Sequence, residues 1–283
     1  GVGDVETLAA AVRTAADAGA TVVNISSVAC AAADQSLDDG ALGAALSYAV
    51  DVKNVVIVAA AGNVGGAGQC PRQNPAPDPG HPGRPNWDDV QVVASPAWYD
   101  DYVLTVGSVD RTGRPSTFTL SGPWVDVAAP GEAVVSLSAD GEGLIDSVPG
   151  STPREPISGT SYSAPVVAGI VALVRSASPR LTARQVMHRI EDTAHHPTAG
   201  WDPWVGYGVV DALAAVSTDG VRPGPASTRT SPTPPPDTGS TSWWTTSRRV
   251  ALLGAAVCVA AVAAAMTLPS RRLRHRRESV ANR

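Results

Sequence analysis

A serine stands where an acyl-transfer site could be built. Ser161 lies in a tight polar turn, residues 158–161, which runs straight into a segment rich in small apolar residues. Pro165 predicts that a helix starts there, because proline is tolerated in the first turn of a helix. The hydroxyl of Ser161 would then lie beside free amides and the positive end of the helix dipole, which favours attack that creates an oxyanion. An ordinary serine or threonine N-cap on a buried helix is the alternative interpretation.

An asparagine is the second candidate for chemistry. Asn63 follows an apolar run at residues 54–60 that predicts a buried strand. Its carboxamide could donate to the developing negative oxygen, with the backbone N–H of Ser161 as the second donor. Taken alone, however, Gly62-Asn63 is more typical of a simple turn.

Three blocks of sequence carry a family resemblance. Residues 159–165 (Gly-Thr-Ser-Tyr-Ser-Ala-Pro), followed by Val-Ala-Gly at 167–169, resemble the nucleophile segment of subtilisin-like serine proteases. Residues 55–63 resemble that family's strand-to-oxyanion segment, and residues 126–131 resemble its Asp-x-x-Ala-Pro-Gly stretch. The resemblance covers about residues 4–216 and implies that Ser161 is the nucleophile and Asn63 an oxyanion donor.

The elements around these blocks predict an α/β fold. Helical spacing at residues 4–18 precedes a β-rich run at 21–26, and an amphipathic helix at 36–52 precedes the strand at 54–60. This alternation predicts a mainly parallel sheet with helices on both faces, as in the three-layer subtilisin-like domain, here incomplete at its N-terminus. Strands are also expected at 103–109 and 124–128, a helix at 183–194, and polar loops at 64–97 and 138–155.

Sites in such sheets form beyond the carboxyl ends of the strands. The resemblance implies a substrate cleft at this edge, with backbone partners for an extended polypeptide at Ser26, Ser27, Val28, Ala60, Ala61 and Gly62. Residues 201–208 resemble the segment that closes subtilisin-like domains, and we expect them to pack under the sheet. No cofactor is expected, and no metal, because no calcium-ligand loop or cysteine-based metal spacing is recognisable.

The catalytic base and the residue that orients it are not evident. Acyl transfer requires both, and the family carries an aspartate after its first strand and a histidine in a His-Gly block. Neither pattern occurs here, and the histidines stand in unsuitable surroundings, at positions His81, His188, His195, His196 and His275. The sequence therefore predicts the C-terminal part of a longer protease, inactive by itself, with the missing residues upstream.

The C-terminal quarter of the chain has a different composition. Residues 217–247 are rich in Ser, Thr, Pro and Gly and predict a linker that separates them from the domain at 1–216. Residues 250–268 form an uncharged apolar run, which predicts a transmembrane helix at 248–270, although a buried Ala-rich helix is the alternative. The following basic tail at 271–283 predicts a cytoplasmic C-terminus and an extracytoplasmic domain.

Charge separates the two ends of the chain. Residues 248–283 hold eight Arg and one Glu, or +7, so that residues 1–247 carry −12 of the total of −5. An acidic body excludes a nucleic-acid partner. The basic end beside an apolar run indicates a membrane instead.

The cysteines fit an exported domain. Cys30 and Cys70 lie in loop-like surroundings ahead of the predicted anchor, which favours one extracytoplasmic disulfide over two free thiols. Anchor, linker and cysteine pair together resemble the mycosins, membrane-anchored subtilisin-like proteases associated with type VII secretion. This resemblance implies an extracytoplasmic serine endopeptidase that processes secreted polypeptides and has membrane proteins of a secretion complex as partners.

Two other functions remain open at this point. The absent aspartate and histidine, together with the predicted anchor, favour a non-catalytic membrane-associated scaffold. Gly1-Val2-Gly3 could belong to a nucleotide-binding α/β domain, but it lacks the preceding strand and the third glycine that such a motif requires.

Overall fold

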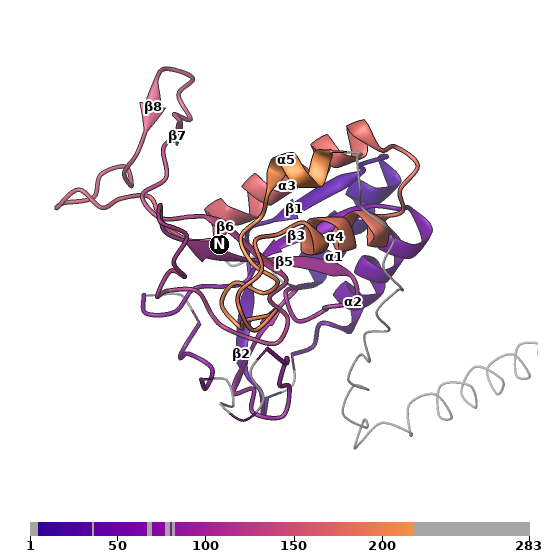
Figure 1. Cartoon of the computed structure of the whole chain (residues 1–283), viewed down its shortest axis with the longest axis horizontal. Helices are drawn as coiled ribbons and strands as arrows, with labels where there is room; N and C mark the ends of the chain where they lie inside the picture. The colour runs from indigo at the N-terminus through magenta and orange to yellow at the C-terminus, as the bar shows by residue number, and fades with distance from the viewer. Residues whose placement is uncertain (1–4, 36, 67–69, 77–79, 81–82, 218–283) are drawn as a thin grey trace, which may run out of the picture. The chain divides into compact units, whose positions relative to one another are not determined.

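A parallel sheet forms the centre of the molecule, as predicted (Figure 1). The computed structural model describes residues 5–35, 37–66, 70–76, 80 and 83–217. All neighbouring strands of this sheet are parallel, in the order β1 (Val22–Ile25), β3 (Val56–Ala60), β5 (Val103–Val109) and β6 (Val127–Pro130). Every residue of β3 and β5 is buried, which explains why β3 reads as a continuous apolar run.

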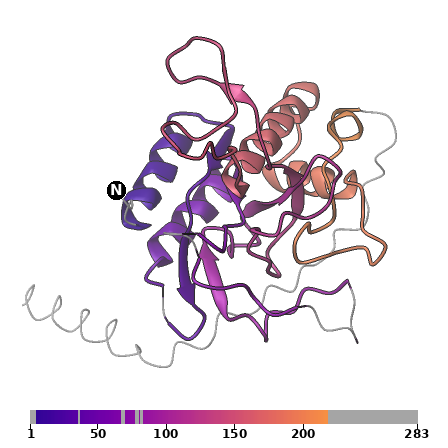
Figure 2. The same cartoon turned by 90° about the vertical axis from the view of Figure 1, so that its left-hand side faces the viewer.

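Helices cover the two faces of the sheet (Figure 2). On one face α1 (Val5–Asp17) packs against α2 (Gly40–Ser47), which continues as the π-helical turn η1 (Tyr48–Val52). On the other face α3 (Thr160–Ala177) contacts all four strands, with α4 (Ala183–Asp192) and α5 (Ala212–Val216) packed against it. The three-layer α/β architecture expected from the sequence is therefore confirmed.

The main apolar core fills the space between these layers. Val12 and Leu46 contribute to it from the first two helices, Ile57 from β3, and Val167 and Val171 from α3. The two valines are four residues apart on one face of α3, so the helix buries an apolar stripe against the sheet. This packing fixes the start of α3 at the carboxyl edge of the sheet.

Two predicted loops contain strands. β2 (Ala29–Ala32) pairs antiparallel with β4 (Val92–Ser95), which lies inside the segment predicted as the loop 64–97. The loop predicted at 138–155 holds most of a hairpin, β7 (Ser136–Leu137) with β8 (Leu144–Ile145), which stands away from the sheet in Figure 1. Both loop predictions were wrong, because Val-Val-Ala-Ser of β4 is too short a run within a Gly/Pro-rich segment and the polar hairpin lacks the alternation that marks a strand.

Side chains that hydrogen-bond nearby backbone groups mark the start of α4 and the turn after β5. Thr182 accepts a hydrogen bond from the Gln185 N–H at 3.2 Å, and the Gln185 side chain accepts one from the Thr182 N–H at 2.8 Å, which forms a capping box at the start of α4. Asp110 accepts from the N–H groups of Thr112 and Arg114 and so closes the turn after β5.

The closing segment packs under the sheet, as predicted. The indole N–H of Trp201 donates to the Val125 carbonyl at 3.1 Å, and the Ala128 N–H of β6 donates to the Gly208 carbonyl at 2.9 Å. Within the part of the chain that the structure describes, every helix is too short or too polar to cross a lipid bilayer. The predicted linker, transmembrane helix and basic tail, from residue 218 onward, lie outside the described residues.

Candidate active site

Two glycines shape the turn that leads to Ser161. Gly159 is the N-cap of α3 and has φ +153°, a conformation that side chains disfavour. Its N–H donates to the carbonyl of Gly131 at 2.9 Å, at the end of the predicted Asp-x-x-Ala-Pro-Gly block. A Cβ on Gly131 would lie 2.2 Å from Ser163 Oγ and 2.9 Å from the Gly159 carbonyl oxygen, so only glycine fits there. The end of this upstream block therefore packs directly against the turn that leads to Ser161.

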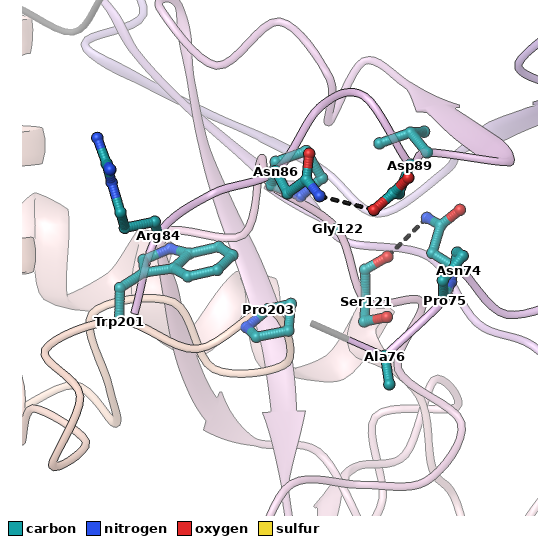
Figure 3. Close-up of a pocket in the computed structure, with 12 residues that line it drawn as sticks. Asn74, Pro75, Ala76, Arg84, Asn86, Asp89, Ser121, Gly122, Trp201 and Pro203 are labelled. Atoms are coloured by element: carbon teal, nitrogen blue, oxygen red, sulfur yellow. Dashed lines mark hydrogen bonds between the residues drawn. The ribbon is translucent and has the colours of Figure 1, made fainter. Parts of the chain in front are cut away.

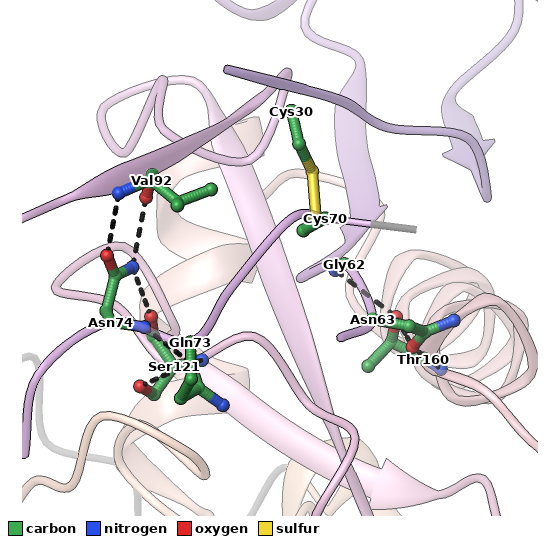
Figure 4. Close-up of a disulfide and its surroundings, with 9 residues drawn as sticks. All are labelled: Cys30, Gly62, Asn63, Cys70, Gln73, Asn74, Val92, Ser121 and Thr160. Atoms are coloured by element: carbon green, nitrogen blue, oxygen red, sulfur yellow. Dashed lines mark hydrogen bonds between the residues drawn. A yellow bond between two sulfur atoms is a disulfide. The ribbon is translucent and has the colours of Figure 1, made fainter. Parts of the chain in front are cut away.

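Asn63 is held against the same turn (Figure 4). Its Oδ1 accepts two hydrogen bonds from Thr160, one from the backbone N–H at 3.0 Å and one from the hydroxyl at 2.9 Å. The Thr160 hydroxyl oxygen in turn accepts from the Gly62 N–H at 3.2 Å. With Oδ1 fixed, the NH₂ group of Asn63 points toward the turn: a Cβ on Gly159 would be 3.2 Å from Nδ2.

Ser161 presents its hydroxyl and its amide at this place. Its Oγ donates to the carbonyl of Ser26 at 2.8 Å, across 135 positions of sequence. Neither the Ser161 N–H nor Asn63 Nδ2 donates a hydrogen bond to any described residue. One partly buried hydroxyl and two free donors thus meet at the positive end of α3, a set suited to attack on a carbonyl and to stabilising the resulting oxyanion.

Pro165 lies deeper in α3 than predicted. Because the helix starts at Thr160, Pro165 is its sixth residue and sits in the second turn. The expectation of a first-turn proline was therefore wrong by about half a turn. A proline at this depth removes the helical hydrogen bond to Ser161, four residues earlier.

Several of the predicted substrate-binding residues make contacts within the fold. Ser26 contacts Ser161, Ser27 is exposed, and Val28 packs against the main core and against a second apolar cluster that includes Leu120 and Trp124. At the other predicted wall, the Ala61 N–H donates to Val106, while Gly62 donates to Thr160 and accepts from Leu120. These three backbone groups are therefore already hydrogen-bonded within the fold. The role of Ala60, Ala61 and Gly62 in binding a polypeptide stays a prediction.

The sequence matches a known protein family. Residues 1–208 match the family model described as Subtilase family. The chain belongs to the subtilase family.

The similar proteins of known name include several mycosins. This subtilase is 58% identical to Mycosin-4 of Mycobacterium tuberculosis (strain ATCC 25618 / H37Rv), over 99% of this chain and 61% of the mycosin. It is 47% identical to a crystal structure of MycP1 from Mycobacterium smegmatis, with a TM-score of 0.74 and coverage of 81% and 59%. A chain of an intact ESX-5 inner membrane complex is 43% identical, with a TM-score of 0.73 and coverage of 93% and 61%. The resemblance to mycosins is confirmed, and the chain spans about three fifths of the length of these relatives.

The described histidines of this subtilase lie on α4 and in the segment after it. Nδ1 of His188 is 3.2 Å from the buried carboxylate of Glu191, and Nε2 of His195 is 3.5 Å from Asp211. The ring of His196 stacks edge-on against Tyr207. Each has a structural partner there, whereas the Ser161 hydroxyl is bonded to Ser26. His81 and His275 lie outside the described residues.

A disulfide joins β2 to the segment after Asn63, and the predicted pairing is confirmed. Cys30 of β2 is bonded to Cys70 with their Cα atoms 5.3 Å apart (Figure 4). Cys70 also donates its N–H to the Asn63 carbonyl at 2.9 Å, and its sulfur would lie 3.2 Å from a Cβ on Gly62. The bond therefore ties the oxyanion segment to the strand that follows Ser26–Val28.

A small cavity lies apart from these residues (Figure 3). It measures about 40 Å³, between Asn74, Arg84, Asp89, Ser121 and Trp201 among others. Figure 3 shows Asn86 turned toward Asp89 and Asn74 toward Ser121, contacts that hold the surrounding loops together. A space of this size holds a water molecule or two and no peptide side chain, so it does not compete with Ser161 as the site.

Sequence reasoning missed the roles of three residues at the site. Thr160 orients Asn63, the Gly131 carbonyl accepts from the Gly159 N–H, and the Ser26 hydroxyl donates to the Ser161 carbonyl. Only a backbone role had been predicted for Ser26. One signal for Ser26 was present in the sequence. A proline four residues after the nucleophile implies that the nucleophile's carbonyl needs a partner from outside the helix.

Proposed function

We propose that the chain is the nucleophile-bearing part of a subtilisin-type serine endopeptidase. Ser161 Oγ attacks the carbonyl carbon of a peptide bond, and its proton passes to a histidine and then to the leaving amine. The NH₂ group of Asn63 and the N–H of Ser161 stabilise the negative oxygen. The observation that carries the proposal is the pair of Thr160 hydrogen bonds that fixes Asn63 Oδ1 and leaves its NH₂ group free beside Ser161.

The base and its aspartate come from elsewhere in this proposal. The described histidines are engaged on and after α4, and about two fifths of the Mycosin-4 sequence has no counterpart in this chain. We infer that this uncovered sequence supplies both residues and that residues 1–283 alone are inactive. The same sequence would also contribute to the substrate cleft beside Ser27 and Val28.

We also propose a membrane-bound, extracytoplasmic enzyme with the boundaries expected from the sequence. Residues 1–216 form the peptidase domain, 217–247 the linker, 248–270 a single transmembrane helix and 271–283 the cytoplasmic tail. The uncharged run at 250–268 and the arginines after it support this topology. The similarity to a chain of the ESX-5 inner membrane complex supports secretion-complex proteins as partners and secreted polypeptides as substrates.

Labelling with a fluorophosphonate tests the catalytic proposal in the full-length protein. The probe phosphonylates an activated serine: the Oγ–P bond forms, fluoride leaves and the proton goes to the base. We expect labelling that is lost in Ser161→Ala and unchanged in Ser176→Ala, a control on the exposed side of α3. Asn63→Ala should slow labelling by roughly 10²- to 10³-fold, a range taken from removal of the corresponding type of donor in a subtilisin.

A scaffold without catalysis is the second candidate. The observation in its favour is that Ser161 Oγ is hydrogen-bonded to a backbone carbonyl and to no described histidine. If the full-length protein is folded but unlabelled, the protease proposal is wrong and the scaffold replaces it. Labelling that persists in Ser161→Ala would refute Ser161 as the nucleophile.

A further inference from the structure

The carbonyl of the nucleophile residue lacks its normal helical partner. In an α-helix each carbonyl accepts from the N–H four residues later. For Ser161 that residue is Pro165, which has no N–H and whose ring crowds the same carbonyl. A carbonyl left unpaired away from water destabilises the local structure, so a partner from another element is required.

Ser26 provides that partner. Its hydroxyl donates to the Ser161 carbonyl at 2.9 Å, from the carboxyl end of β1. Asn24 donates from Nδ2 to the same hydroxyl oxygen, also at 2.9 Å. Because a serine hydroxyl carries one proton and Asn24 fills a lone pair, the proton of Ser26 is directed to Ser161.

A second hydrogen bond runs in the opposite direction. Ser161 Oγ donates to the Ser26 carbonyl at 2.8 Å, so each serine donates its hydroxyl proton to the other's backbone. One residue thus holds both the backbone and the side chain of the nucleophile. The backbone bond is independent of the proton on Ser161 Oγ, so it persists when that proton moves to the base.

We propose that Ser26 is a positioning residue for Ser161, whose hydroxyl replaces the hydrogen bond that Pro165 removes from α3. The inference rests on the proposed protease function and deepens it. Ser26 acts through the Ser161 backbone and takes no part in bond making. By fixing the first turn of α3, it sets the distance and direction of Oγ toward the scissile carbonyl, and small errors in that geometry slow the reaction strongly.

A double-mutant cycle in the full-length protein tests this role. Ser26→Ala leaves the Ser161 carbonyl unpaired, and we expect fluorophosphonate labelling to slow by roughly five- to a hundredfold. On a peptide substrate the loss should appear in kcat with little change in KM. Ser26→Thr keeps the hydroxyl and should label close to the wild-type rate.

Pro165→Ala is the second single variant of the double-mutant cycle. Pro165 is exposed, and alanine restores an N–H that can bond to the Ser161 carbonyl within the helix. We expect Pro165→Ala alone to label normally, and Ser26→Ala/Pro165→Ala to recover most of the lost rate. A purely structural role for Ser26 would lower Tm without this recovery of rate.

The outcomes separate this inference from the proposed function. Wild-type protein that is not labelled refutes the protease itself. Labelled wild type with an equally reactive Ser26→Ala variant overturns only the positioning role, and so does a double variant as slow as Ser26→Ala. Should Ser26→Ala not fold, the double variant and Ser26→Thr decide: reactive variants support the role, and a folded double variant with slow labelling refutes it.

Discussion

Gly131 and Gly159 meet backbone to backbone, with the Gly159 N–H donating to the Gly131 carbonyl at 2.9 Å. The contact joins the end of β6 to the N-cap of α3, 28 positions later in the chain. It places the nucleophile turn directly over the edge of the sheet. A side chain at Gly131 would push the two segments apart, because its Cβ would lie 2.9 Å from the Gly159 carbonyl oxygen.

Gly131→Ala should therefore damage both stability and reactivity. The new Cβ would lie 2.2 Å from Ser163 Oγ and 2.5 Å from Ser108 Oγ, in a fully packed place. We expect the free energy of unfolding to fall by about 2–3 kcal/mol, with slower fluorophosphonate labelling. Gly169→Ala is the control, since a Cβ there meets no described atom within 4 Å, and it should stabilise α3 by up to about 1 kcal/mol. Equal effects of the two substitutions in chemical denaturation would contradict this account.

Asp17 should make the stability of the fold depend on pH. The hydrogen bond from the Tyr48 hydroxyl at 2.6 Å, followed by the ammonium of Lys53 at 2.9 Å, holds the pKa of Asp17 well below its usual range. A depressed folded pKa means that the stabilisation is complete above the unfolded pKa, near pH 4, and is lost as the pH falls further. Asp17→Asn should thus lower Tm at pH 7, and the difference from wild type should shrink below about pH 4.

Thermal unfolding between pH 2 and pH 8 measures this effect. Asp34→Asn, in an exposed turn after β2, is the matched control and should follow the wild-type curve. A difference between Asp17→Asn and wild type that stays constant down to pH 2 would rule out the ionised Asp17 as its source.

The disulfide should contribute to stability and to the alignment of Asn63. Cys30 and Cys70 close a loop of 40 positions, so replacing both by serine should cost about 2–5 kcal/mol of unfolding free energy. Cys70 also donates to the Asn63 carbonyl, and we expect slower labelling even where the variant is fully folded. Added reductant should slow wild type and leave the double variant unchanged. A reductant effect of the same size in both proteins would place the sensitive group elsewhere.

Histidines on and after α4 should be dispensable for catalysis. His188 is paired with Glu191, and His195 is largely exposed beside Asp211. His188→Ala and His195→Ala should label at the wild-type rate, although His188→Ala should lower Tm because it uncovers a buried carboxylate. Loss of labelling in a folded His195→Ala variant would identify that residue as the base and refute an external one.

Sequence patterns predicted the elements whose burial or capping is local. The strands β3 and β5 were predicted because both of their faces are covered, and the structure shows that α4 starts at a local capping box formed by Thr182 and Gln185. The β2–β4 pair was not predictable, since its two strands are joined only by pairing across about 60 positions and by the disulfide. Tertiary contacts decide such strands, and composition does not reveal them.

The candidate site likewise contains residues that the sequence could predict and residues whose roles it could not. Ser161 and Asn63 stand in segments with a recognisable order of residue types, so both could be singled out. The roles of Thr160, Ser26 and Gly131 depend on contacts between distant segments, and their types alone are equally typical of turns and caps. Only coordinates show that they orient the two candidates.

The hydrogen bonds between Ser26 and Ser161 also bear on when the site is assembled during folding. They span 135 positions and join the end of β1 to the start of α3. Before such non-local contacts form, the chain must lose the loop-closure entropy of the segment between them. A chain in which β1 and α3 have not yet met would therefore carry Ser161 without either hydrogen bond to Ser26.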